Sequence, residues 1–192
     1  MTVEKELKIL LTSDEFERLQ SLSDAPAVLQ INHYFACPSA QVDEMLRIRQ
    51  KAGKFLMAYK RRFCTIGDVF SAEEYEKELT KDQAERFLQN GVFGKDAQEI
   101  LGVDLPDGRS WKFVGSLSTL RTAFYFRGFP LELDANEYLG ARDFELECEG
   151  DDVDFAHLRE ALAEVGVFGK PSCPKSQRFF QQAKLNTTKQ ND

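Results

Sequence analysis

The feature that most constrains the fold is a series of short segments in which apolar and charged side chains alternate. Residues 45–50 alternate Leu46 and Ile48 with Arg47 and Arg49, and residues 141–149 place glutamates at alternate positions. Because successive side chains of a β-strand point to opposite faces, each segment predicts a strand with one apolar and one charged face. The few short helical patterns between these segments favour a mainly β, antiparallel protein.

The segment boundaries give the expected elements. We expect strands at 3–12, 28–37, 45–50, 54–63, 73–79, 110–117, 119–127, 130–138 and 141–149, and helices from Thr12 to about Leu22, in two short pieces over 81–102, over 152–165 and over 176–184. Thr12 and Glu15 form a capping box. The sequence Gly-Val-Phe-Gly-Lys occurs at 91–95 and at 166–170, which indicates a shared helix stop more than two phosphate-binding lysines.

The overall prediction is a single α+β domain over residues 1–185, with a frayed tail at 186–192. The set of about eight strands would be mainly β and antiparallel, flanked by helices, and closed into a barrel. Closure leaves no free edge strand and gives the sheet an interior face of its own.

The composition excludes several classes of protein. A net charge of −7 makes a nucleic acid an unexpected main partner, although a local basic cluster can still bind a small phosphorylated ligand. No apolar stretch is long enough to span a membrane, and no signal peptide is recognisable at the N-terminus, so we expect a cytoplasmic protein with reduced thiols. With two histidines and no paired cysteines, a metal site would depend on carboxylates, which suit Mg²⁺, Mn²⁺ or Ca²⁺.

The charged positions of the strands are segregated by sign. The residues in phase are Glu4, Glu6 and Lys8; Arg47 and Arg49; Lys60; Glu76 and Glu78; Arg121; Glu132 and Asp134; and Glu145, Glu147 and Glu149. For a single strand, an ordinary solvated face explains such a pattern. Like charges repeated on neighbouring strands repel one another, however, and a bound cation beside the acids with a bound polyanion beside the bases would relieve that repulsion. Acids that hold a metal and bases that hold phosphate are the parts required for phosphoryl chemistry.

The order of these motifs resembles the CYTH family, also called triphosphate tunnel metalloenzymes. Residues 4–8 read Glu-Lys-Glu-Leu-Lys, similar to the family's opening E-x-E-x-K strand. The later matches are the aromatic strand at 32–35, the L-R-x-R strand at 46–49, Gly53 followed by Lys60, Leu120-Arg121-Thr122, Leu133-Asp134 with Tyr138-Leu139-Gly140, the paired-Glu strand at 144–147 and Pro174-Lys175-Ser176. Where the family often has Asp-Thr-Pro after the aromatic strand, this chain has Ala36-Cys37-Pro38, which puts any role of that loop in doubt.

The resemblance implies an eight-stranded antiparallel tunnel flanked by helices, and a role for each matching residue. The implied metal ligands, for Mg²⁺ or Mn²⁺, are Glu4, Glu6, Asp134, Glu145 and Glu147, to which we add Glu132 from the same face as Asp134. The implied triphosphate contacts are Lys8, Arg47, Arg49, Lys60, Arg121 and Lys175, with Glu76 and Glu78 lining the same tunnel. Lys8 and Tyr34 match a Lys–Tyr pair near the reacting end that is linked to substrate choice in the thiamine triphosphatase branch, and the resemblance therefore implies that they are the catalytic residues, although Tyr34 also suits a core aromatic position.

Three functions follow as expectations. The first is metal-dependent hydrolysis of a triphosphate, whether inorganic triphosphate, thiamine triphosphate or a nucleoside triphosphate. The second is an adenylate cyclase of the same fold, in which the 3′-hydroxyl of ATP attacks the α-phosphate. The third is a polyphosphate-binding module without turnover, which the full set of acids and bases disfavours. Hydrolysis is the simplest of the three because it needs no pocket for a base.

Overall fold

The structure is a computed structural model that describes residues 6–40, 44–66, 69–105, 108–150 and 153–189, without the side chains of 62–66, 69–73 and 189. The elements, in chain order, are β1 (Glu6–Leu11), α1 (Ser13–Gln20), β2 (Val28–Ala36), β3 (Glu44–Lys51), β4 (Lys54–Ile66), β5 (Val69–Leu79), α2 (Lys81–Asn90), β6 (Val92–Phe93), α3 (Gly94–Leu101), β7 (Ser110–Phe126), β8 (Phe129–Tyr138), β9 (Ala141–Glu149), α4 (Phe155–Glu164), β10 (Lys170–Pro171) and α5 (Lys175–Lys189). Within the described residues, no helix is both long enough and apolar enough to cross a membrane.

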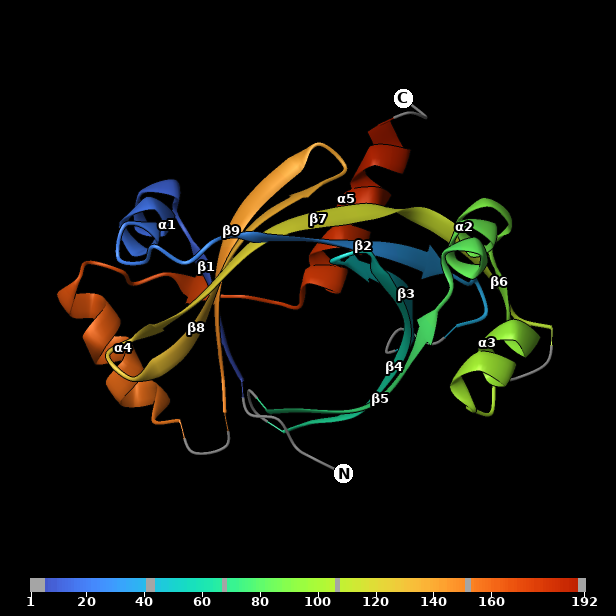
Figure 1. Cartoon of the computed structure of the whole chain (residues 1–192), viewed down its shortest axis with the longest axis horizontal. Helices are drawn as coiled ribbons and strands as arrows, with labels where there is room; N and C mark the ends of the chain where they lie inside the picture. The colour runs from blue at the N-terminus through green and yellow to red at the C-terminus, as the bar shows by residue number, and fades with distance from the viewer. Residues whose placement is uncertain (1–5, 41–43, 67–68, 106–107, 151–152, 190–192) are drawn as a thin grey trace.

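All long strands belong to one antiparallel sheet. Its order is β10-β1-β9-β8-β7-β2-β3-β4-β5, and β6 pairs with β7 beside this path. The sheet curls strongly, with α1 and α4 at one end of the molecule and α2 and α3 at the other (Figure 1). The predicted class, mainly antiparallel β with flanking helices, is confirmed. Hydrogen bonds do not complete the ring, because in the described part of the chain β5 pairs only with β4, while β1 pairs with β9 and β10.

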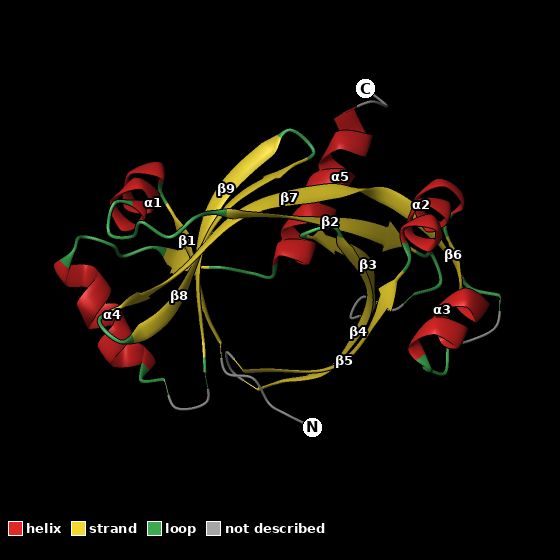
Figure 2. Ribbon diagram, viewed as in Figure 1, coloured by secondary structure: helices red, strands yellow, loops and turns green. Residues whose placement is uncertain are grey.

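Helices α1 to α4 cover the outer face of the sheet in two places (Figure 2), and the strand side chains that they meet there are apolar. At one end, the amphipathic helix α1 buries Phe16 and Leu19, and α4 buries Leu158, against leucine and isoleucine side chains of β1, β8 and β9. At the other end, Phe87 of α2 packs with the aliphatic residues of β3 and with Trp111 of β7. Helices α1 to α4 therefore take up the apolar positions of the alternating strands and leave the charged positions to the inner face, against which α5 lies.

Several predicted boundaries were wrong. The segments 110–117 and 119–127 form one strand, β7, because Ser118 pairs with Ile31 of β2 on one side and with Glu137 of β8 on the other, so the chain does not turn there. Strands β4 and β5 extend further toward one another than predicted. Helix α5 runs to Lys189 instead of ending at 184, and the Asn186 side chain donates a hydrogen bond to the Leu139 carbonyl at 3.1 Å.

The helix-stop interpretation of the repeated pentapeptide is confirmed. Gly91 ends α2 with φ of +81°, and Gly166 follows α4 with φ of +72°. A Cβ at position 91 would lie 2.6 Å from the Trp111 carbonyl oxygen, so the turn needs glycine for space as well as for conformation. The lysines of the two repeats, Lys95 and Lys170, are exposed.

The capping box of α1 also fixes the loop that follows α4. Glu15 accepts hydrogen bonds from the backbone N–H of Thr12, Phe168 and Gly169, at 2.8 to 3.0 Å. Burial raises the pKa of Glu15, but these backbone donors outweigh burial and lower the pKa to about 2. The ionised carboxylate therefore stabilises the junction between the two helices.

We expect Glu15→Gln to lower the free energy of unfolding at pH 7 by about 1–2 kcal/mol, since the charged acceptor is lost. A depressed carboxyl pKa contributes stability above the ordinary value of about 4.3, and this stability disappears as the pH falls toward the folded-state pKa. The deficit should therefore shrink between about pH 4.5 and pH 2 in urea titrations. Glu17→Gln, at an exposed position of the same helix, is the matched control, and an equal deficit in both variants would contradict the prediction.

Candidate functional site

Strand pairing brings charges that are distant in sequence onto the inner face of the sheet. Arg121 of β7 pairs with Asp134 of β8, which pairs with Glu145 of β9. One step along, Glu132 of β8 pairs with Glu147 of β9, which pairs with Lys8 of β1. We call Asp134, Glu145 and Glu147, with Glu6 and Glu132 beside them, the acidic half.

Glu147 is the centre of the acidic half. Its Oε1 atom lies 2.7 Å from Lys8 Nζ and 2.7 Å from Lys175 Nζ, and its Oε2 atom lies 2.5 Å from Arg121 Nη2. Burial raises the pKa of Glu147, but the positive charges of Lys175, Lys8 and Arg121 lower it far below the ordinary range. Glu147 is therefore a buried, ionised carboxylate at neutral pH.

Arg121 and Lys175 neutralise the remaining acids. Arg121 binds Asp134 through two hydrogen bonds, Nε to Oδ1 at 2.7 Å and Nη2 to Oδ2 at 2.6 Å, and it also contacts Glu132. Lys175, at the start of α5, lies 2.8 Å from Asp134 and 3.1 Å from Glu145 in addition to its pair with Glu147. Burial lowers the pKa of Lys175, but the three carboxylates more than offset this effect and raise it.

The part of the inner face on β3 and β4 forms the basic half: Arg47, Arg49 and Lys60. Arg47 lies 3.0 Å from Glu74, and Lys60 lies 3.2 Å from the same carboxylate. Arg49 donates from Nε to the Asn32 side chain at 3.1 Å. Glu74 and Asn32 were not among the predicted site residues, although Glu74 is in phase with Glu76 and Glu78 on the same strand.

The two halves lie within electrostatic reach of one another. Burial lowers the pKa of Arg49, and the positive charges of Arg47 on its own strand and of Arg121 in the acidic half lower it further. Such an effect is in keeping with guanidinium groups on one poorly solvated face, to which the strand registers assign all three arginines. Three arginines brought together in this way match the requirements of a polyanion with several phosphate groups.

Tyr34 and Lys8, the predicted catalytic pair, lie in different parts of this face. Tyr34 is 1% exposed, and its ring centroid is 4.7 Å from that of Phe179. Burial raises the pKa of Tyr34, while the charges of Arg47, Lys175 and Arg49 oppose the increase. Among the contacts of the described residues, none joins Lys8 to Tyr34. The structure therefore gives Tyr34 a core position that adjoins the charged lining.

The remaining predicted residues lie toward the exposed margins. Glu6 forms an ion pair with Lys8 at 2.7 Å, and burial raises its pKa. The side chain of Glu76 is 42% exposed, and that of Glu78 is 60% exposed and pairs with Lys54. Glu4 lies outside the described residues. The core of the predicted set is therefore Lys8, Arg121, Asp134, Glu145, Glu147 and Lys175, with Arg47, Arg49 and Lys60 facing them.

The acids have the chemistry for a hard divalent cation, although no described group of three or more His, Cys, Asp or Glu side chains is already arranged around one. Their oxygens instead contact Lys8, Arg121 and Lys175. Among the buried oxygens of these acids, Glu145 Oε1 is the exception, because it has no hydrogen-bond partner in the described part of the chain. A buried carboxylate oxygen without a partner is costly, and a metal ion would satisfy it.

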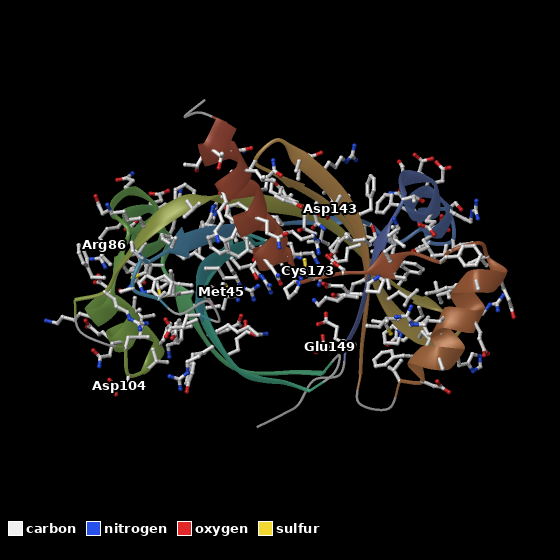
Figure 3. The ribbon with its side chains drawn as sticks, turned by 180° about the vertical axis from the view of Figure 1, so that it is seen from behind. Met45, Arg86, Asp104, Asp143, Glu149 and Cys173 are labelled. Carbon is white, nitrogen blue, oxygen red and sulfur yellow. The ribbon has the colours of Figure 1, made fainter. Side chains whose placement is uncertain are left out.

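A polar network behind the acidic half was not predicted. Arg178 of α5 binds Asp143 and Glu145 of β9, and Asp143 also accepts hydrogen bonds from Asn136 and Tyr138 of β8. Figure 3 shows Asp143 and Cys173 close to the ribbon of α5 in the middle of the molecule, away from Arg86 and Asp104. The alternation of charged and apolar residues that identified the strand residues does not apply to Arg178, because Arg178 lies on helix α5. The sequence pattern of that helix predicts only that it is amphipathic.

Comparisons with known proteins agree with this geometry. A family model described as the CYTH domain matches residues 2–180. The solved structure of a proposed adenylate cyclase from Bacillus halodurans is 29% identical over 93% of this chain and 100% of that chain, with a TM-score of 0.70. That of a proposed adenylyl cyclase from Hippeastrum, described as having a dominant triphosphatase activity, is 25% identical over 93% of this chain and 95% of that chain, with a TM-score of 0.74.

More distant structures share the fold alone. A protein from Pyrococcus horikoshii is 19% identical over 94% of this chain and 99% of that chain, with a TM-score of 0.60. No protein with a curated description matches the sequence.

Proposed function

Because the chain belongs to the CYTH family, we propose that it is a divalent-metal-dependent hydrolase that cleaves a triphosphate on the inner face of its curled sheet. The observation that carries the proposal is that one face of the sheet bears both Arg47 and Arg49 of β3 and a buried group of acids on β8 and β9 that contains Glu147. The Hippeastrum protein, for which a dominant triphosphatase activity is described, supports the same reaction. We expect the enzyme to act in the cytoplasm on a small molecule, without nucleic acid or membrane.

The acids would hold the metal ion. Asp134, Glu145 and Glu147 form the centre of this set, and Glu6, Glu132 and Glu4 would complete it or hold a second ion. When bound, Mg²⁺ or Mn²⁺ would supply Lewis-acid polarisation of the phosphate oxygens. The buried carboxylates place negative charge where a cation is required, and their lysine and arginine partners become available for phosphate.

The basic side chains would bind and orient the substrate. Arg47, Arg49 and Arg121 can each donate two parallel hydrogen bonds to a phosphate, which fixes the chain of phosphates along the inner face. Lys8, Lys60 and Lys175 add charge that offsets the charge developing on the transferred phosphoryl group and on the leaving group. Tyr34, packed against Phe179, would help to exclude water from the end where α5 covers the sheet.

A second candidate is adenylate cyclase, which the similarity to the Bacillus halodurans protein favours. The acidic and basic halves would serve both reactions, because each reaction needs a metal ion and a bound triphosphate. Product analysis separates the two after incubation with ATP and Mn²⁺: cyclic AMP with pyrophosphate indicates the cyclase, and ADP with phosphate indicates the hydrolase.

We expect phosphate release from at least one of tripolyphosphate, thiamine triphosphate, ATP and GTP in the presence of Mg²⁺ or Mn²⁺, and its loss on addition of EDTA. Lys8, Arg47 and the other bases bind only the phosphates, so tripolyphosphate should be the minimal substrate. The measurement is a phosphate assay over this panel with each metal. If none of the substrates releases phosphate or cyclic AMP, while polyphosphate still binds tightly, the protein is a binding module and the hydrolase proposal is wrong.

A further inference from the structure

Arg178 uses every hydrogen-bond donor of its guanidinium group. Nε donates to Asp143 Oδ2 at 2.9 Å. Nη2 donates to Asp143 Oδ1 at 3.2 Å and to Glu145 Oε2 at 2.6 Å. Nη1 donates to Ser172 Oγ at 2.5 Å and to the Cys173 carbonyl at 2.6 Å. A guanidinium group has five N–H donors in a fixed plane, so this set of contacts defines the positions of its partners as well as neutralising them.

These contacts fix one of the acids of the proposed metal site. Arg178 and Lys175 both lie against Glu145 Oε2, at 2.6 Å and 3.1 Å. The other oxygen, Oε1, has no hydrogen-bond partner in the described part of the chain, and Glu145 itself is fully buried. Each oxygen of Asp134 and Glu147, by contrast, contacts at least one cationic side chain. Among the buried carboxylates of Asp134, Glu145 and Glu147, Glu145 Oε1 is thus the oxygen that remains available to bind a ligand.

Arg178 also connects this acid to the helix that carries Lys175. The two residues are three positions apart on α5, so both point toward the acidic half from the same helix face. The contacts with Ser172 and Cys173 attach the segment before α5 to the same guanidinium group. A change at Arg178 would therefore move Glu145 and Lys175 together.

We propose that Arg178 is a positioning residue that orients Glu145 so that Oε1 faces the divalent cation, and that it sets the metal affinity of the site through Glu145 without touching metal or substrate. This inference rests on the proposed metal-dependent function. Outer partners of metal-binding carboxylates and histidines typically change metal affinity by about 10- to 100-fold when they are removed.

The test compares Arg178→Met and Arg178→Lys with wild type in Mn²⁺ titration calorimetry, without substrate. We expect both variants to bind Mn²⁺ about 10- to 100-fold more weakly, since lysine keeps the charge but cannot reproduce the planar set of donors. In turnover assays, raising the Mn²⁺ concentration should restore kcat for Arg178→Lys, because the groups that contact the substrate are unchanged. Arg109→Met is the matched control: its side chain is 11% exposed, pairs with buried Glu44 outside the lining, and should leave Mn²⁺ affinity unchanged.

The outcomes separate the two proposals. If the wild-type protein does not bind Mn²⁺ at all, the proposed metal-dependent function is wrong and the role of Arg178 falls with it. If the wild-type protein binds Mn²⁺ and both folded Arg178 variants bind it equally well, the function stands and the positioning role is overturned. If Arg178→Met does not fold, Arg178→Lys decides alone, with its fold checked by circular dichroism and thermal unfolding.

Discussion

Glu147→Gln should reduce kcat for the preferred triphosphate by at least about 100-fold while the protein remains folded. Glu147 is ionised and buried, and it forms ion pairs with Lys8, Lys175 and Arg121. Its surroundings therefore favour the binding of positive charge at this carboxylate. Glutamine keeps the size of the side chain but removes the charge that a metal ion requires. Its amide group would also turn N–H donors toward these cationic side chains, which are themselves donors.

The measurement is phosphate release under saturating substrate and metal, with circular dichroism to confirm the fold. Glu164→Gln is the control, because Glu164 forms an exposed pair with Arg127 away from the site and should retain full activity. Glu4→Gln, at a position outside the described residues, is expected to behave like Glu147→Gln. Wild-type turnover in both Glu4→Gln and Glu147→Gln would rule out the metal assignment.

Strand alternation carried most of the fold prediction, because it depends only on the local geometry of the β-strand. The apolar positions of β1, β8 and β9 meet α1 and α4, and the charged positions face inward, as the period of two predicts. The length of β7 was not predictable in this way. Whether the chain turns near Ser118 depends on neighbours on both sides of the strand, which come from β2 and β8. The extension of α5 likewise depends on a tertiary contact between Asn186 and Leu139.

The site residues also divide into those that the sequence could identify and those that depend on tertiary contacts. The in-phase charges of β3, β8 and β9 could be assigned to one face from the sequence, and the resemblance to a family supplied Lys175, which no strand pattern includes. Arg178 and Asp143 could not be assigned, because their relation joins a helix to a strand 35 positions earlier in the chain. Asn32 was missed because a neutral amide does not contribute to a charge pattern, even though it orients Arg49.

The mutual neutralisation of acids and bases explains how an acidic protein can keep a cluster of arginines on its inner face. Asp134 is fully buried, and an unpaired carboxylate at this depth would be strongly destabilising. Arg121 donates a hydrogen bond to each carboxylate oxygen of Asp134. These hydrogen bonds also keep the Arg121 guanidinium group beside the position where phosphate would bind. The same ion pairs thus stabilise the fold and hold the functional groups in place, which couples stability to the proposed activity.

Arg121→Met should lower the free energy of unfolding at pH 7 by about 3–5 kcal/mol, because it removes one partner of a buried ion pair and leaves the other charged. The pKa of Glu147, which Arg121 helps to hold far below its ordinary range, would rise in the variant. A depressed carboxyl pKa contributes stability above the ordinary value of about 4.3 and loses it as the pH falls. The deficit of the variant should therefore be largest at neutral pH and narrow below about pH 4.

Urea denaturation of Arg121→Met and wild type at pH 7 and at about pH 2.5 measures both parts of this prediction. Arg127→Met provides the control, since Arg127 pairs with Glu164 at the surface, where solvent screens the pair, and its loss should change stability little at either pH. A deficit for Arg121→Met that is as small as that of the control would show that the acidic half does not depend on this arginine. A large deficit that does not change with pH would instead assign its cause to lost packing, because the methylenes of the side chain do not titrate.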